Sequence, residues 1–512
     1  MNNSVKIVLG AVFAAAVAWY AGSITTQGVH GGFLVLAALF GAYMAMNIGA
    51  NDVANNVGPA VGAGALSIGG AIVIASIFEA GGALIAGGDV VGTIKKGIID
   101  PVAFGGDPML FVYGMSAALL AAALWLNLAT WLKAPVSTTH SIVGGVLGGG
   151  IAAGGVAIVS WGTMGKIAAS WVISPVLGGV IAAVFLYIIK SQILYKEDRI
   201  GAAKKVVPIL VAVMAAAFMT YLTLKGLKHI WKDLADLFSF LPQTKKPTFG
   251  IALLFGAIGG IATFFVVKPK VVRRVGGMEG SRADINLLFT IPLIFAAALL
   301  SFAHGANDVA NAVGPLAAVN DALTHLAVSK KAAIPLWVMV VGGVGISVGL
   351  ALYGPRLIRT VGSEITELDQ MRAFSIMMAA AITVVIASQL GLPVSSTHIA
   401  VGAVFGVGFL REWLDSKNMP QKQERLREEI DKLEALKAEL DACTNEDPAE
   451  KLRLIEAHKA QKKAVKRLKK RLKENYVKRD MVKKIVAAWI ITVPAAAVLS
   501  ALIFYVLKGV GG

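Results

Sequence analysis

The chain has 512 residues, of which 56% are hydrophobic and only 15% are charged, and its mean hydropathy is +0.71. This composition excludes a soluble globular protein, and its 56 glycines suit closely packed membrane helices. The net charge of +17 comes largely from lysines and arginines that gather at 190–205, 268–282 and 411–483. Such clusters are typical of the cytoplasmic loops of membrane proteins and argue against a nucleic-acid-binding protein.

The apolar segments predict an all-α polytopic membrane protein with about 12–13 transmembrane helices, because about 20 apolar residues cross a bilayer. Lys6 and the apolar run up to Tyr20 resemble a signal peptide, but the run has no clear cleavage site, so we expect an uncleaved first helix. The expected spans are, in chain order, 5–24, 32–48, 66–88, 109–132, 136–158, 164–190, 205–224, 248–267, 285–303, 332–355, 372–390, 394–410 and 484–507.

Residues 49–59 form a polar string, Gly-Ala-Asn-Asp-Val-Ala-Asn-Asn-Val-Gly-Pro, between two apolar runs. Its carboxylate, Asp52, is therefore expected at membrane depth, where a charge costs about 2.5–3.5 kcal/mol on insertion scales. Nearly the same string returns at 305–315, with Asp308 in the equivalent position. Two copies of so costly a feature predict a functional site.

Glycine and proline residues in both strings predict breaks in the helices and short half-helices at 53–62 and 309–318. Freed backbone carbonyls and the Asp and Asn side chains would then supply hard oxygens, which suit a small cation. A structural alternative is that Asn-Asp caps a helix and Gly-Pro turns the chain. The residues predicted to bind the cation are Asn51, Asp52, Asn307, Asp308 and Glu79, and those predicted to break the helices are Gly49, Gly58, Pro59, Gly305, Gly314 and Pro315.

Glu79 is a further acid in an apolar segment, 66–88. It could bind a cation, carry a proton or form a hydrogen bond between helices, and we include it in the predicted cation site. His304 adjoins the second polar string, whereas Ile48 stands at the equivalent place before the first. The histidine therefore marks a difference between the two copies.

A second pair of repeated strings begins with proline and carries hydroxyl groups: Pro-Val-Ser-Thr-Thr-His at 135–140 and Pro-Val-Ser-Ser-Thr-His at 393–398. Each is typical of a helix start with proline near its first position. Backbone N–H groups, the positive end of the helix dipole and hydroxyls together form an anion site, although ordinary N-capping accounts for one hydroxyl at each start. The residues predicted to bind the anion are Ser137, Thr138, Thr139, Ser395, Ser396, Thr397, Asn55 and Asn311, with His140, His398 and His304 as accessory residues.

A third repeated string, Lys-Ile-Ala-Ala-Ser-Trp at 166–171 and Lys-Ile-Val-Ala-Ala-Trp at 484–489, makes 32–190 and 285–508 two versions of one unit. With the basic loops inside, counting the spans gives the two units opposite orientations, as in many secondary transporters. The N-terminus and the 411–483 insertion are then cytoplasmic. The predicted parts are an N-terminal transmembrane helix (1–31), a first transport repeat (32–190), two linking helices with cytoplasmic loops (191–284), the first part of a second repeat (285–410), a cytoplasmic helical hairpin (411–483) and the last helix of the second repeat (484–512).

In the insertion, apolar residues recur at helical spacing from Leu426 to Leu440 and again from Val465 to Tyr476. This pattern predicts an antiparallel helical hairpin, a short coiled coil without a catalytic role. The single cysteine, Cys443, lies in the same charged region and excludes an internal disulfide bond.

Two anion-binding helix starts and two carboxylate-bearing cation cages predict symport of an anion with cations, because the cations offset the charge of the anion. An anion channel has no need for two buried carboxylates. The sequence has no Walker loop, metal-ligand spacing or nucleophile–base pair, so we expect neither an enzyme nor a bound cofactor.

Through the two pairs of strings and the stretch 76–100, the chain resembles the inorganic phosphate transporter (PiT) family. The resemblance implies secondary uptake of inorganic phosphate across the cell membrane, driven by sodium in some members and by protons in others. The first string is similar to that of sodium-dependent members, so the expected anion is phosphate and the expected cation sodium. The implied partners are phosphate, sodium ions and the lipid bilayer, with no nucleic acid, and a homodimer is compatible with the sequence.

Two alternatives stay open beside this resemblance. One is a proton-coupled phosphate or sulfate permease of the same fold, and the other is an anion channel or exporter. Met377 stands where animal members of the family carry glutamate. The ion stoichiometry of those members is therefore not carried over to this chain.

Overall fold

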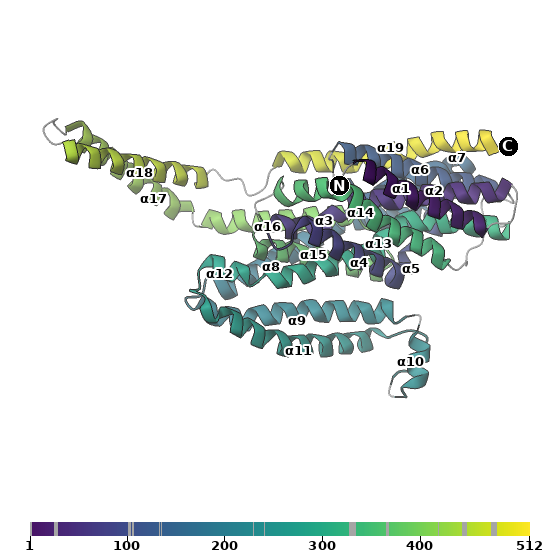
Figure 1. The fold of residues 1–512 in the computed structure, drawn as a ribbon, viewed down its shortest axis with the longest axis horizontal. Helices are drawn as coiled ribbons and strands as arrows, with labels where there is room; N and C mark the ends of the chain where they lie inside the picture. The colour runs from purple at the N-terminus through teal and green to yellow at the C-terminus, as the bar shows by residue number, and fades with distance from the viewer. Residues whose placement is uncertain are drawn as a thin grey trace. The chain divides into compact units, whose positions relative to one another are not determined.

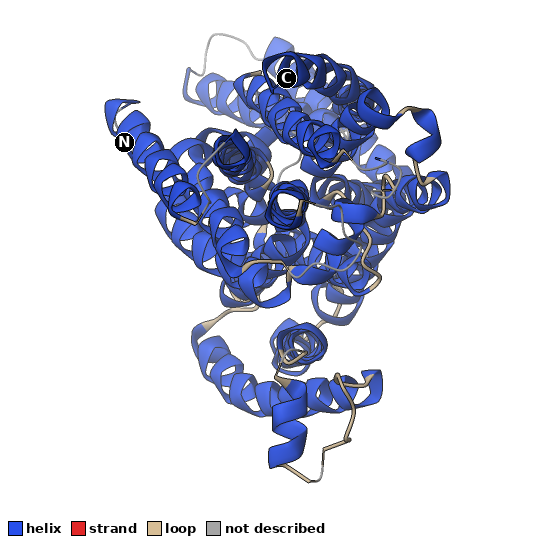
Figure 2. Cartoon of the chain, turned by 90° about the vertical axis from the view of Figure 1, so that its right-hand side faces the viewer, coloured by secondary structure: helices blue, strands red, loops and turns tan. Residues whose placement is uncertain are grey.

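The computed structural model of the chain is built from helices (Figure 1). Among the described residues no β-strand forms, and one isolated bridge joins Ile99 to Val159 (Figure 2). The prediction of an all-α protein is confirmed. The structure describes all residues except 1–2, 25–28, 101–103, 105–106, 133, 135, 229, 240, 327–333, 365–367, 418, 443–447, 473–478 and 512.

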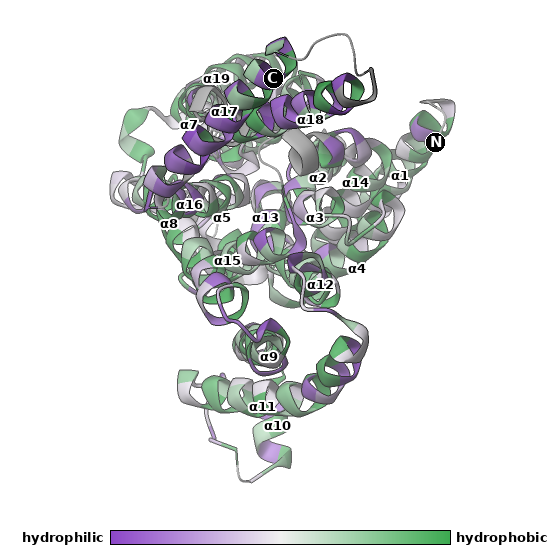
Figure 3. Ribbon diagram, turned by 90° about the vertical axis from the view of Figure 1, so that its left-hand side faces the viewer, coloured by the Kyte–Doolittle hydropathy of each residue, from purple (hydrophilic) through white to green (hydrophobic). Residues whose placement is uncertain are grey.

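The chain divides into two compact units, one of residues 1–407 with 479–512 and the other of residues 408–478. In the second unit, α17 (Met419–Ala442) and α18 (Pro448–Leu472) pack against each other as the periodicity predicts. Gln461 of α18 donates hydrogen bonds to the backbone and the side chain of Glu429 in α17, at 2.9 and 2.7 Å. Hydrophilic residues dominate both helices, as Figure 3 shows.

The repeats expected from the sequence group the helices of the first unit into two sets, with a linking segment between them. The first repeat contains α2 (Val29–Asn51), α3 (Val53–Gly62), α4 (Ile68–Ala86), α5 (Gly88–Lys96), α6 (Pro108–Trp131), α7 (Thr138–Gly154) and α8 (Trp161–Ile189), preceded by α1 (Asn3–Ser23). The linking segment contains α9 (Arg199–Gly226), α10 (Trp231–Leu237), α11 (Phe249–Arg274) and α12 (Arg282–Leu287). The second repeat contains α13 (Thr290–His325), α14 (Leu336–Glu364), α15 (Gln370–Gln389), α16 (Ser396–Lys417) and α19 (Arg479–Gly511).

Eleven stretches of the described chain are helical, long and apolar enough to cross a membrane, which confirms a polytopic membrane protein. Two of the expected spans, 136–158 and 394–410, are not among them. In their place stand α7, which has only 17 residues, and α16, which is polar at both ends. Both helices begin in the protein interior, where Ser137 and Ser395 have no exposed surface. These two helices therefore start at the centre of the unit rather than at its edge.

The glycines and prolines of the polar strings lie inside helices, so the breaks predicted at these residues are wrong. The helix is interrupted instead at Asp52, between α2 and α3, whereas α13 continues without interruption through Asp308. The half-helix expected at 53–62 is α3, whereas 309–318 is the middle of α13.

Gly49 and Gly305 allow two pairs of helices to approach closely. A Cβ atom on Gly49 would lie 1.9 Å from the backbone oxygen of Ile346 in α14, and one on Gly305 would lie 2.2 Å from that of Glu79 in α4. Such contacts exclude any side chain, so glycine is required. The packing of α2 on α14 is therefore equivalent to the packing of α13 on α4.

The two repeats interlock. In the first, α7 packs along α19 of the second repeat, where a Cβ on Gly144 would lie 2.5 Å from the backbone oxygen of Val493. In the second, α16 packs along α8 of the first repeat, where a Cβ on Gly402 would lie 2.2 Å from the oxygen of Pro175. Close backbone contacts of this kind hold helices together in membranes. They join each repeat to the other.

Antiparallel helices α6 and α7 form a hairpin, in which Gly145 faces Ala118 and Gly149 faces Gly114. The equivalent helices of the second repeat, α15 and α16, are joined by the turn 390–395. The inner ends of the two hairpins meet, since the hydroxyl of Thr139 donates to the backbone oxygen of Val394 at 2.8 Å. The two hydroxyl-rich strings thus come together at the centre of the fold.

Gly305→Ala is expected to destabilise the protein by about 1–3 kcal/mol or more, because the new methyl group meets backbone atoms of α4 that cannot move aside alone. Thermal unfolding of the purified protein in detergent would measure the loss. Gly276→Ala is the matched control, since a Cβ there has nothing within 4 Å. Equal unfolding temperatures for both variants would contradict the close contact.

Candidate functional site

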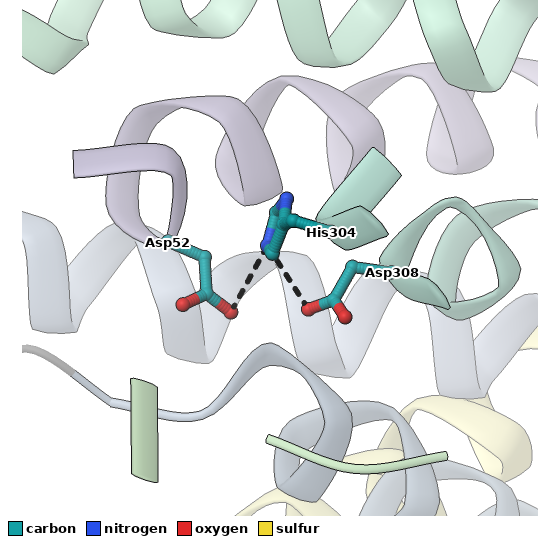
Figure 4. A group of neighbouring side chains, drawn as sticks. All are labelled: Asp52, His304 and Asp308. Carbon is teal, nitrogen blue, oxygen red and sulfur yellow. Dashed lines mark ion pairs between the residues drawn. The ribbon is translucent and has the colours of Figure 1, made fainter. Parts of the chain in front are cut away.

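Asp52, His304 and Asp308 lie together in the interior, and none of them has exposed surface (Figure 4). The Nε2 atom of His304 lies 3.3 Å from Oδ2 of Asp308 and 3.9 Å from Oδ2 of Asp52. One ligand atom from each of the three residues lies within 4.8 Å of the others. The carboxylates of the two polar strings therefore share one site rather than forming two separate cages.

Thr138, at the start of α7, touches both carboxylates. Its hydroxyl lies 2.8 Å from Oδ2 of Asp52 and 3.0 Å from Oδ2 of Asp308. A hydroxyl has one proton and can donate it to only one carboxylate at a time. The hydroxyl oxygen then faces the other carboxylate without a proton between them, and a cation bound to the two carboxylates would offset this repulsion. The site is thus suited to a small, hard cation.

Asn55 and Asn311 join the polar strings to the opposite helix starts. The amide of Asn55 donates to the hydroxyl of Thr397 at 2.9 Å, and Thr397 donates to Oδ1 of Asp52. On the other side, Asn311 donates to the hydroxyls of Thr138 and Thr139, both at 3.2 Å. The residues predicted to bind a cation and those predicted to bind an anion thus form one hydrogen-bonded cluster.

Asn51 and Asn307 hold the ends of the two hairpins in equivalent ways. Asn51 donates to the hydroxyl of Thr130 at 2.9 Å and to the backbone oxygen of Ala134 at 3.3 Å. The amide of Asn307 contacts Ser388 and Leu392 in the same manner, at 3.1 and 3.3 Å. Within the described part of the chain, the buried Oδ1 atoms of both asparagines accept no hydrogen bond. These two oxygens are available to a cation.

Ser137 and Ser395 are N-caps of α7 and α16. Their hydroxyls accept from the backbone N–H groups of His140 and His398, at 3.0 and 3.2 Å. Capping therefore accounts for one hydroxyl at each helix start. Ser396 differs, because its buried hydroxyl has no hydrogen-bond partner among the residues that the structure describes. Pro135, the proline that begins the first hydroxyl-rich string, lies outside the described residues.

Glu79 does not face the two aspartates directly but reaches them through His304. Its Oε2 lies 2.7 Å from Nδ1 of His304, and its Oε1 accepts from the amide of Asn56 at 2.8 Å. In the equivalent packing of α2 on α14, Ile48 and Ile346 replace the histidine and the glutamate, and both are buried. Among the described residues, this polar pair therefore has no polar counterpart in the equivalent contact.

His140 and His398 contact each other next to the helix starts, with ring centroids 4.3 Å apart. Each ring also lies against a tryptophan: His140 against Trp171 at 3.8 Å and His398 against Trp489 at 3.6 Å. The imidazoles are thus packed between indoles, in addition to any hydrogen bond they could give to an anion.

Sequence reasoning assigned no function to Asn56, Trp171 or Trp489, which contact the predicted site residues. The tryptophans end the repeated strings 166–171 and 484–489, so their repetition was a usable signal. Asn56 gave a weaker signal, because the second polar string has Ala312 at the equivalent position.

Comparisons with known proteins agree on one family. Residues 48–500 match the model of the phosphate transporter family. The chain is 49% identical to a putative phosphate permease of Helicobacter pylori, over 99% of this chain and 96% of the relative, and 40% identical to one of Chlamydia trachomatis, over 74% and 90%. A solved structure described as the sodium-dependent phosphate transporter is similar, with a TM-score of 0.74, 32% identity, and coverage of 94% of this chain and all of the other.

Glu79→Ile and His304→Ile are each expected to destabilise the protein by about 3–5 kcal/mol, because each breaks the buried contact between these two side chains. The double variant, which places the apolar residues of the equivalent contact in both positions, is expected to be more stable than either single variant. Thermal unfolding of all three proteins provides the comparison. If the loss of stability in the double variant equals the sum of the losses in the two single variants, Glu79 and His304 are not energetically coupled.

Proposed function

This chain belongs to the phosphate transporter family, and we propose that it carries inorganic phosphate across the cell membrane together with sodium ions. The family and the many apolar helices make it a multi-pass transporter rather than an enzyme. The observation that carries the symport proposal is the contact of Thr138 with both Asp52 and Asp308. The sodium dependence of the transporter whose solved structure is similar supports sodium as the cation.

Coupling follows from the charges at the site. A phosphate at the helix starts would lie close to both aspartates, and two like charges 4 Å apart repel by about 4 kcal/mol at an effective dielectric constant of about 20. Sodium ions on the aspartate oxygens would remove most of this repulsion. The cations therefore enable phosphate to bind, and the helix dipoles and hydroxyls then stabilise it. A channel would gain nothing from this arrangement.

The proposed ligands divide by their chemistry. Sodium would take carboxylate and amide oxygens from Asp52, Asp308, Asn51 and Asn307, with Glu79 acting through His304. Phosphate would take hydroxyl and amide donors at the helix starts. The residues proposed for phosphate are Thr138, Thr139, Ser396, Thr397, Asn55 and Asn311, with Ser137 and Ser395 holding the helix starts in shape.

Alternating access is proposed to depend on the hairpins α6–α7 and α15–α16, with the N-terminus and the 408–478 unit in the cytoplasm. The close contacts of α7 with α19 and of α16 with α8 join the repeats, so rocking of one whole repeat against the other is disfavoured. Movement of a hairpin together with the helix that it packs on, α6–α7 with α19 or α15–α16 with α8, would instead expose the helix starts to one side of the membrane at a time.

Proton coupling is the alternative function that one observation supports. His304 lies between Glu79 and the two aspartates, where a proton could take the place of a sodium ion. The phosphate site would be the same in both versions. The two versions differ only in the ion that neutralises the carboxylates.

Phosphate uptake into proteoliposomes, with sodium and proton gradients imposed separately, tests the proposal. An inward sodium gradient is expected to drive accumulation of phosphate, and a proton gradient without sodium is expected to drive little. Asp52→Asn and Asp308→Asn are expected to abolish accumulation, because each removes a charge that sodium requires. Uptake driven by protons alone would overturn the sodium version, and flux that needs no gradient of either ion would indicate a channel.

Ser396→Ala and Ser395→Ala form a matched pair at the start of α16. Ser396→Ala is expected to weaken phosphate binding at least severalfold without lowering stability, because its hydroxyl bonds to no described protein group. Ser395→Ala is expected to cost about 1 kcal/mol of stability through loss of the cap. Isothermal titration with phosphate and thermal unfolding separate the two effects. Unchanged phosphate affinity in Ser396→Ala would remove this serine from the site.

A further inference from the structure

The turn that joins α15 to α16 is held by side chains from five other helices. Each of these side chains donates a hydrogen bond to a backbone oxygen at the end of α15 or in the turn. The five pairs are Lys225 of α9 with Ser388 (3.1 Å), Thr93 of α5 with Gly391 (2.7 Å), Asn307 of α13 with Leu392 (3.3 Å), Trp171 of α8 with Pro393 (3.3 Å) and Thr139 of α7 with Val394 (2.8 Å).

One of these donors comes from outside the repeats. Asn307 has its equivalent in Asn51, which holds Ala134 in the first hairpin at the same distance of 3.3 Å. Lys225 lies on α9, which belongs to the segment between the repeats and has no counterpart in either. The lysine is therefore a restraint on the second hairpin that the pseudo-two-fold symmetry does not require.

Lys225 suits the end of a helix both chemically and by its position. It is only 6% exposed, and its ammonium group donates to Ser388 in the last turn of α15. A cation at this end of a helix is stabilised by the helix dipole and by the last carbonyl groups. One and two turns earlier on α9, Tyr221 and Phe218 pack edge-on against Phe302 of α13. This contact holds α9 against α13, and it therefore also sets the position of Lys225 relative to the end of α15.

We propose that Lys225 is a positioning residue for transport. By fixing the end of α15, it sets the place of the turn and of the start of α16, which carries Ser396 and Thr397. Thr397 donates to Asp52, so a displaced turn would separate the phosphate-binding hydroxyls from the sodium-binding carboxylate. This inference rests on the proposed function.

Lys225→Met, which keeps the length of the side chain but removes its charge, is expected to raise the KM for phosphate about tenfold while lowering the maximal rate much less. Lys225→Arg is expected to restore most of the affinity, because it keeps a donor and a charge. Lys205→Met is the matched control on the exposed side of the same helix, with wild-type kinetics expected. An unchanged KM in Lys225→Met, or an equal loss in Lys225→Arg, would overturn the proposal.

A second measurement does not depend on transport. Val394 is 1% exposed, so a cysteine there, in a Cys443→Ser background, is expected to react slowly with a maleimide in detergent. Adding Lys225→Met, or Thr93→Val as a milder release of the turn, is expected to raise the labelling rate at least severalfold. An unchanged rate in Lys225→Met would overturn the positioning role, whatever the rate in Thr93→Val. Failure of the wild-type protein to carry phosphate would instead refute the proposed function and leave this structural result standing.

Discussion

The arrangement of the whole fold depends on two carboxylates that are buried beside each other. Asp52 and Asp308 contact the same threonine hydroxyl and face the same imidazole, without exposed surface. Two like charges so placed repel each other, and each also loses its hydration. His304 and the surrounding hydroxyls and amides offset part of this cost. We propose that the remainder favours the binding of cations and is the physical source of the proposed coupling.

Small residues make this arrangement possible. Backbone contacts at Gly49, Gly144, Gly305 and Gly402 bring helices of different repeats together without intervening side chains. In a membrane, where burial of apolar surface gives little advantage to helix association, such close packing supplies much of the stability. It also interlocks the repeats, so the mobile parts must be smaller than a repeat. The two hairpins, whose inner ends carry the hydroxyl groups, are the natural candidates, each moving with the helix of the other repeat on which it packs.

Local polar substitutions make the two halves different. Glu79 and His304 occupy positions at which the equivalent contact has Ile346 and Ile48, and Lys225 donates a hydrogen bond to the end of α15 in the second hairpin. A symmetric site would bind its ions equally well from both sides. These departures give the two hairpins unequal restraints and the two aspartates unequal distances to the histidine. A transporter can use such differences to favour one state when empty and another when loaded.

The sequence by itself determined the fold class, the repeated unit and the residues of the central cluster. Hydropathy over the length of a bilayer, and polar strings repeated in apolar surroundings, are local signals that do not depend on tertiary contacts. Tertiary structure alone decided that Gly49 and Gly305 are packing positions rather than breaks, because the need for a glycine arises from a backbone that approaches from another helix. It also decided that Asp52, Asp308 and Thr138 meet at one point, that Glu79 acts through His304, and that Lys225 holds a distant turn. Residues far apart in the chain make these contacts, and local spacing carries no information about which of them will be neighbours.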